Sequence, residues 1–144
     1  MKRYLPFVII AVLAFFYLSD HWPEVSDVSP STQSSDSVIQ DAFENGLSDI
    51  QVRGEGRVIK VLKDDLDGSR HQRFILRLAS GQTVLVAHNI DLAPRVAGLK
   101  QGDMVEFFGE YEWNNKGGVI HWTHHDPAGR HVGGWLKHDN KTFQ

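Results

Sequence analysis

The sequence contains no cysteine among its 144 residues. This absence excludes disulfide bonds, thiolate zinc sites, a cysteine nucleophile and a lipid-modified cysteine. A dinucleotide-binding loop is also missing, because RGEGR at residues 53–57 has neither the third glycine nor the helix that such a fingerprint needs. No serine stands in a G-x-S-x-G pattern, so the nucleophile elbow of an α/β-hydrolase is absent too.

The chain has no strong excess of either charge, since its formal net charge is −3. That balance argues against a protein that coats nucleic acid without sequence preference. The charge is nevertheless uneven, because residues 1–50 hold two basic and seven acidic residues, whereas residues 51–144 hold thirteen basic and eleven acidic ones. The body of the chain is therefore mildly basic. Histidine is abundant, with eight residues.

A long apolar run occurs once, over Tyr4–Leu18, directly after Lys2 and Arg3. The run is shorter than the roughly 20 residues of a typical transmembrane helix, but it ends in bulky residues instead of the small residues of a signal cleavage site. We therefore expect residues 1–22 to form an uncleaved signal anchor that crosses a bacterial inner membrane once. Basic residues before the run and acidic residues after it place the rest of the chain in the periplasm. The alternative is a protein secreted to the periplasm after signal cleavage.

Residues 23–35 are rich in Ser, Pro and Asp and predict a flexible linker, followed by a folded domain over residues 36–144. The domain begins with a short amphipathic helix for which Asp36 is the expected N-cap. Its apolar face combines side chains at helical spacing, namely Val38, Ile39, Ala42, Phe43 and Leu47.

From Ile50 onward apolar residues alternate with a period of two, which predicts strands. We expect five of them: Ile50–Leu62, His71–Leu78, Gln82–His88, Asp103–Trp113 and Gly118–His124. Gly54 and Gly56 allow a bend or bulge in the first strand, and Pro127 is expected to end regular pairing. The fold class is therefore all-β with a small α contribution. A three-strand meander, a connector and a hairpin match the order of a five-stranded OB-fold-like barrel, and an SH3-like or other small barrel is the alternative.

The last hairpin carries its own register signal. A symmetric turn centred on Asn115 and Lys116 sets Tyr111 opposite Ile120, and Glu110 opposite His121. Apolar side chains then meet apolar ones, and charged side chains meet charged ones. The alternation predicts one core that contains Phe74, Leu76, Val105, Phe107, Tyr111, Ile120 and Trp122.

Several long motifs resemble those of a bacterial family known only as a domain of unknown function. They are RHQRFIL (Arg70–Leu76), AHNIDLAPR (Ala87–Arg95), GEYEWN (Gly109–Asn114), GGVIHWTHHDP (Gly117–Pro127) and HVGGWLKH (His131–His138). The resemblance implies membership of that family, and it brings no activity or catalytic assignment with it.

Charged and histidine side chains alternate with the expected core residues, which places them on the outer face or at the barrel mouth. As ligand-binding residues we expect His71, Arg73, Arg77, His88, Arg95, Glu110 and His121. The candidate acid–base groups are Glu110, His121 and His125. The sharpest hypothesis is that His71, Arg73, Glu110, His121 and His125 share one ligand. The alternative is that Glu110 and His121 form an exposed cross-strand pair and that the arginines lie on a solvated face.

Imidazole and carboxylate are the metal ligands that remain when thiolate is absent. The candidates for a divalent metal ion are His121, His124, His125, Asp126 and His131. Their spacing is neither that of a zinc protease nor that of an EF-hand, and whether a metal binds stays open.

Three functions remain open, and one of them is enzymatic. The first is a periplasmic module that binds a polar or anionic small molecule, an oligosaccharide or an oligonucleotide on the His/Arg/Glu face. The second is a metal-dependent hydrolase, similar to a phosphodiesterase or nuclease, that uses the same side chains. The third is a structural adaptor for a protein partner in an envelope complex. Convergence of the candidate residues in one hollow would favour the second, and scattered residues would favour the third.

Overall fold

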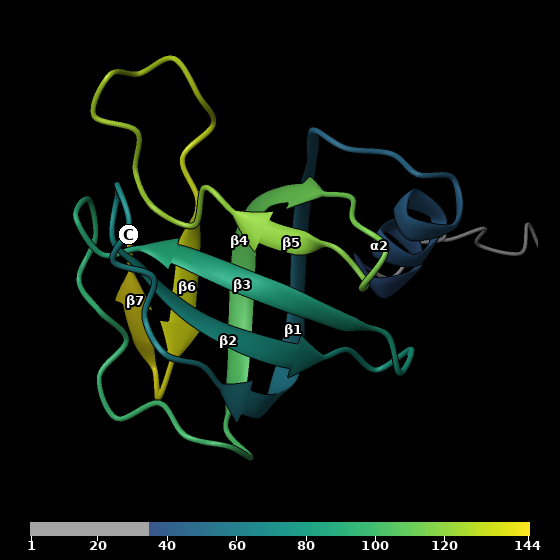
Figure 1. Ribbon diagram of the computed structural model, residues 1–144, viewed down its shortest axis with the longest axis horizontal. Coiled ribbons are helices and arrows are strands. Elements are labelled where there is room, and N and C mark those ends of the chain that lie inside the picture. Colours follow the sequence, from purple (N-terminus) through teal and green to yellow (C-terminus); the bar gives the residue numbers. More distant parts are fainter. Residues whose placement is uncertain (1–34) are drawn as a thin grey trace, which may run out of the picture. The chain divides into compact units, whose positions relative to one another are not determined.

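The computed structural model describes residues 35–144 (Figure 1). The expected signal anchor and all but the last residue of the expected linker lie outside the described residues. Between residues 35 and 144 no helix has the length and apolar character needed to cross a membrane. This part of the chain forms α2 (Ser35–Glu44), β1 (Ile50–Val61), β2 (His71–Arg77), β3 (Thr83–Asn89), β4 (Met104–Glu112), β5 (Val119–His121), β6 (Trp135–His138) and β7 (Lys141–Phe143).

Five of these strands close into a barrel in the order β1-β2-β3-β5-β4, with β4 pairing back to β1. Strands β3 and β5 run parallel, and the other neighbours in the barrel are antiparallel. This arrangement confirms the expected five-stranded OB-fold-like barrel. Closure pairs the edges that an open five-stranded sheet would expose.

Strand β1 serves both halves of the barrel. Its first part, Ile50–Arg57, pairs with β4, and its last part, Arg57–Val61, pairs with β2. The register shifts between Val58 and Lys60, beyond the two glycines expected to bend the strand. Gly54 instead allows close packing, because a Cβ there would lie 2.7 Å from Cζ of Phe107.

The core confirms six of the seven side chains expected in it. Phe74, Leu76, Val105, Phe107, Tyr111 and Ile120 are all fully buried. Trp122 was wrongly placed, because β5 ends at His121 and not at His124. Trp122 has a φ of 52°, which is rare for a bulky residue and breaks the alternation of the strand. Its ring leaves the core and stacks on His131, with ring centroids 4.0 Å apart.

The expectation that regular pairing ends at Pro127 was also wrong, because β6 and β7 follow. Along one edge of β4, Glu110–Glu112 pair with β5 and Glu106–Phe108 pair with β6. The loop over residues 122–134 leaves the sheet between these two pairings, as the yellow-green arch in Figure 1 shows. It rejoins at Gly134, where a Cβ would lie 2.1 Å from the Trp122 carbonyl oxygen. Only glycine fits this junction.

Helix α2 packs Ile39 and Ala42 into the core against β1. It begins one residue before the expected cap, and the Asp36 carboxylate accepts a hydrogen bond from the Ser80 amide in the β2–β3 turn. Figure 1 accordingly shows α2 at the end of the barrel where β2 turns into β3. Leu47, expected on the apolar face of the helix, lies beyond its end and is about half exposed.

Candidate functional site

A hollow of about 420 Å³ lies on the outer face of the barrel across β2, β3, β5 and the end of β4. The pairing registers explain which residues meet there. Arg73 is opposite Ala87, Leu85 is beside Val119, and Glu112 is opposite Val119. Every second residue of each strand therefore faces the hollow. Its lining combines an apolar part with a charged part, and consists of Asp65, His71, Arg73, Leu85, Ala87, Glu112, Val119 and His121.

Arg73 and His71 enter the hollow from β2. The Arg73 guanidinium donates from Nε and Nη2 to the Lys63 carbonyl at 3.2 and 3.0 Å, and its Nη1 lies 3.9 Å from Asp65. These contacts fix the cation at the start of the β1–β2 loop. The Ser69 carbonyl lies 2.7 Å from Nδ1 of His71, and because a carbonyl only accepts, Nδ1 carries the proton. In the neutral ring Nε2 is then a free acceptor.

His121 faces two carboxylates at the opposite rim of the hollow. The expected register is confirmed, with Glu110 opposite His121 and Tyr111 opposite Ile120. Nε2 of His121 lies 3.2 Å from Oε1 of Glu110 and 3.8 Å from Oε1 of Glu112. Within residues 35–144 this nitrogen is shielded from solvent but makes no hydrogen bond, although the Glu110 carboxylate lies close to it. One ligand atom from each of the three residues lies within 4.8 Å of the others.

His131 approaches Glu110 from the other side. Nε2 of His131 lies 2.6 Å from Oε2 of Glu110, and Nδ1 lies 2.8 Å from the Val132 carbonyl. Both partners are acceptors, so both bonds form together only when the ring is an imidazolium. Burial lowers the pKa of His131, but the hydrogen bonds to Glu110 and Val132 outweigh it and raise that pKa above 6.5 overall. The stacked Trp122 ring completes this contact.

Asp126 shapes the loop that delivers His131. Its carboxylate accepts hydrogen bonds from the amides of Ala128, Arg130 and His131 at 2.9, 2.7 and 2.9 Å. These bonds lower the pKa of the Asp126 carboxyl, so the group stays ionised. Asp126 was one candidate metal ligand, and in the described chain its oxygens accept these three hydrogen bonds within the loop.

The remaining predicted site residues lie away from the hollow. His125 is exposed beside a different depression of about 280 Å³ that includes Phe108 and Trp135. Arg77 is exposed at the far end of β2. His124 is buried, and its Nδ1 lies 2.8 Å from the His125 carbonyl. The structure therefore brings His71, Arg73, Glu110 and His121 to one face, whereas it does not bring His125 there.

His88 points into the barrel from β3 and is fully buried. Its Nε2 lies 3.1 Å from the Pro94 carbonyl, and its Nδ1 lies 2.8 Å from the Thr123 hydroxyl. Burial is the main cause that lowers the pKa of His88 from 6.5 to about 4, so the ring is neutral at pH 7. Both ring nitrogens are thus used within the protein.

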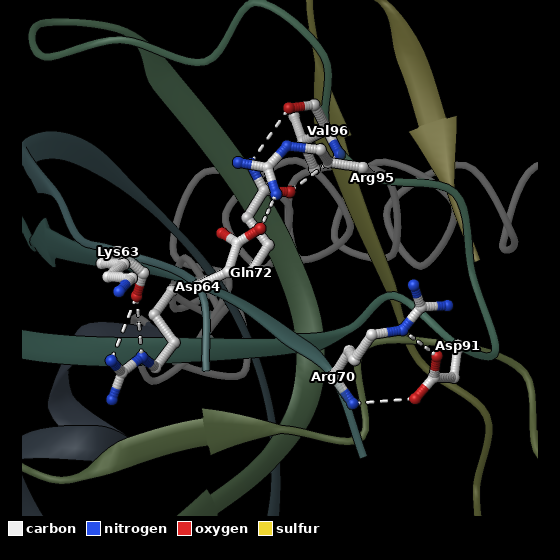
Figure 2. Close-up of polar contacts among 8 residues, drawn as sticks. Lys63, Asp64, Arg70, Gln72, Asp91, Arg95 and Val96 are labelled. Carbon is white, nitrogen blue, oxygen red and sulfur yellow. Dashed lines mark hydrogen bonds and ion pairs between the residues drawn. The ribbon is translucent and has the colours of Figure 1, made fainter. Parts of the chain in front are cut away.

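Arg95 belongs to a set of contacts that fasten the loops at one end of the barrel. Figure 2 shows Arg95 directed toward Asp64, with which it forms an ion pair. Nearby, the Arg70 guanidinium lies 2.6 Å from the Asp91 carboxylate. The buried Gln72 amide exchanges two hydrogen bonds with the backbone of Val96. The two ion pairs join the β1–β2 loop to the connector between β3 and β4, and the Gln72–Val96 hydrogen bonds join β2 to the same connector.

Sequence reasoning missed Glu112 and Asp65 as lining residues. Glu112 shares the strand parity of Glu110, so the alternation of β4 contained the signal. Asp65 lies in a loop, where no periodicity places a side chain. The stacking of Trp122 on His131 depends on the positive φ of Trp122, which no sequence pattern predicts.

A family model described as "Protein of unknown function (DUF3465)" covers residues 24–144. No curated protein matches the chain.

Proposed function

The chain belongs to the DUF3465 family, whose description assigns no function, and we propose that its barrel binds a polar or anionic ligand in the hollow across β2, β3 and β5. One observation carries this proposal. The hollow has an apolar part of Leu85, Ala87 and Val119 and a polar part that consists of Arg73, two histidines and two carboxylates. Small-molecule sites typically combine an apolar lining with a few fixed polar groups.

The position of the hollow supports the same reading. OB-folds bind oligonucleotides and oligosaccharides on the face of their second and third strands, next to the loop between the first two strands. Here β2 and β3 supply His71, Arg73, Leu85 and Ala87, and the β1–β2 loop supplies Asp65. This argument is an analogy between folds, so it supports only the location of the site. The kind of ligand is inferred from the side chains that line the hollow.

The proposed location is the periplasmic side of a bacterial inner membrane. It rests on the basic start and the apolar run over Tyr4–Leu18. A module tethered there would meet envelope solutes such as phosphorylated small molecules, oligosaccharides or oligonucleotides.

The test measures binding by the full chain, purified in mild detergent, to three probes: pyrophosphate, a short single-stranded oligodeoxynucleotide and a chitooligosaccharide. Arg73→Ala should weaken binding of the anionic probes at least about tenfold, because a hydrogen bond to a charged group contributes about 1.5–3 kcal/mol. Arg77→Ala is the matched control, since it removes the same side chain from the same face of β2 outside the hollow.

Equal losses in both variants would indicate general attraction to a basic surface and would overturn the proposal. So would the absence of binding to all three probes. The two other functions stay predictions that the same experiment separates. Breakdown of a bound probe would favour the hydrolase, and retention of a protein partner without any probe binding would favour the adaptor.

A further inference from the structure

Two carboxylates stand where a site for anions should have none. Glu112 lines the proposed hollow. Glu110 lies two residues before it on the same side of β4, and both carboxylates are beside His121. Unneutralised carboxylates would repel an anionic ligand at this rim. Arg73 does not offset them, because it lies on β2 and its nearest carboxylate is Asp65.

We propose that Glu110, Glu112 and His121 bind one divalent transition-metal ion at the rim of the hollow. The three residues come from adjacent strands in fixed register, with Glu110 opposite His121 and Glu112 opposite Val119. Their donor set, one imidazole nitrogen and two carboxylate oxygens, suits Zn²⁺ and similar ions better than Mg²⁺ or Ca²⁺, which prefer oxygen ligands alone.

The spacing of the ligand atoms fits a metal. Bonds of about 2.1 Å in a tetrahedral site set neighbouring ligand atoms about 3.4 Å apart. Nε2 of His121 lies 3.2 Å from Oε1 of Glu110 and 3.8 Å from Oε1 of Glu112. All three ligand atoms lie within 4.8 Å of one another.

The environment of each ligand supports the same conclusion. Nε2 of His121 is shielded from water and makes no hydrogen bond within residues 35–144, which leaves a buried polar atom unsatisfied. A bound ion would satisfy it. Glu110 keeps Oε1 for the ion, because its Oε2 already accepts the 2.6 Å hydrogen bond from His131. Such outer hydrogen bonds orient carboxylate ligands in metal sites.

The ion would also explain how an anion enters the hollow, a consequence that rests on the proposed function. Three protein ligands leave a tetrahedral ion with one open position. His121 and Glu112 both line the hollow, so a phosphate or carboxylate oxygen of the ligand can take that position. The anion would then lie between the ion and the Arg73 side.

The experiment titrates Zn²⁺ into the metal-stripped full chain in mild detergent and follows binding by calorimetry and metal analysis. One equivalent should bind with high affinity. Glu112→Gln should weaken it at least about tenfold, the lower end of the loss caused by removing even an outer-shell partner. Glu106→Gln is the matched control, because Glu106 shares the strand and parity of Glu112 but pairs with Lys137 at 3.3 Å.

His125→Gln controls for chance binding by an exposed histidine. The metal site would be overturned if His125→Gln no longer bound one Zn²⁺ tightly, or if Glu112→Gln bound Zn²⁺ as tightly as the unchanged chain. Melting curves of the metal-free variants show whether each one folds. If Glu112→Gln does not fold, His121→Gln replaces it with the same expected loss.

Pyrophosphate binding, measured with and without Zn²⁺, separates this inference from the proposed function. Binding that requires Zn²⁺ supports both. Zinc binding without any probe binding keeps the metal site and overturns the proposed function. Probe binding that depends on Arg73 but not on Zn²⁺, in a chain that holds no zinc, keeps the proposed function and overturns the metal site.

Discussion

Acidification should destabilise the barrel through His88. This side chain is fully buried on β3, where the Pro94 carbonyl accepts from Nε2–H and the Thr123 hydroxyl donates to Nδ1. That pattern satisfies the neutral ring. Burial is the largest cause of its low pKa, and the charges of His124 and His71 lower it further, while the hydrogen bond to the Pro94 carbonyl and an interaction with the Thr123 backbone raise it. The balance is a pKa of about 4 against 6.5 for an unperturbed histidine.

The sign follows from comparing the two states. The unfolded chain binds a proton at His88 near pH 6.5, whereas the folded chain resists it until about pH 4. The contribution to stability is therefore complete above pH 6.5 and is lost as the pH falls toward 4. At about 1.36 kcal/mol per pKa unit, the full loss is about 3 kcal/mol, of which about 2 kcal/mol is already lost at pH 5.

The assay is guanidinium unfolding of the full chain and of His88→Gln at pH 7.5 and pH 5. The glutamine does not titrate, so the wild-type chain should lose about 2 kcal/mol more than the variant between these pH values. His131, whose raised pKa acts with the opposite sign, is present in both proteins and cancels in the difference.

Equal pH dependence in the two proteins would refute this account of His88. An NMR titration of the His88 ring in the wild-type chain gives a second measurement that needs no variant. A midpoint near 6.5 would show that burial does not perturb the ring.

The other predictions concern packing and the N-terminus. Phe107→Ala should cost about 3–5 kcal/mol in denaturant unfolding, and a loss below about 1 kcal/mol would contradict its burial. Gly54→Ala should also destabilise, because its Cβ would lie 2.7 Å from the Phe107 ring, yet most of this penalty should vanish when Phe107 is already alanine; strictly additive losses would argue against the contact. Gly134→Ala should lower the melting temperature sharply, since a Cβ would lie 2.1 Å from the Trp122 carbonyl oxygen, and an unchanged melting temperature would show that the loop can yield. Mass spectrometry of the native protein should find residues 1–22 still attached, whereas a mature terminus between Ser19 and Val28 would indicate cleavage.

The barrel was predictable because its four longer strands carry a period of two, and the three-residue β5 is placed by the hairpin turn that precedes it. In the β4–β5 hairpin the turn and the alternation agree, so the pairing of Glu110 with His121 follows from counting outward from Asn115 and Lys116. Strands β6 and β7 were not predicted, because they have only four and three residues and come after the glycines at 133 and 134. Such short segments have too few alternations to be distinguished from loop.

The faces of separate strands were harder to relate than residues within one hairpin. Parity shows that His71 and Arg73 lie on one side of β2, but it does not show that this side is continuous with the His121 side of β5. The link is β3, whose antiparallel pairing to β2 and parallel pairing to β5 place Leu85 beside both Ile75 and Val119. A parallel contact between strands far apart in sequence depends on closure of the barrel, so no local pattern encodes it.

In the histidine-rich loop, residue type alone does not predict which contacts a side chain makes. Asp126 and His131 were both predicted as metal ligands on the chemistry of their side chains. Asp126 is the only acidic residue between Trp122 and Gly134, and three amides of the same loop use its carboxylate. Those bonds turn the chain so that His131 reaches Glu110 across the strand pair. The loop thus positions the Glu110 carboxylate on β4, and the ligands of the proposed metal site are side chains that the barrel itself keeps in register.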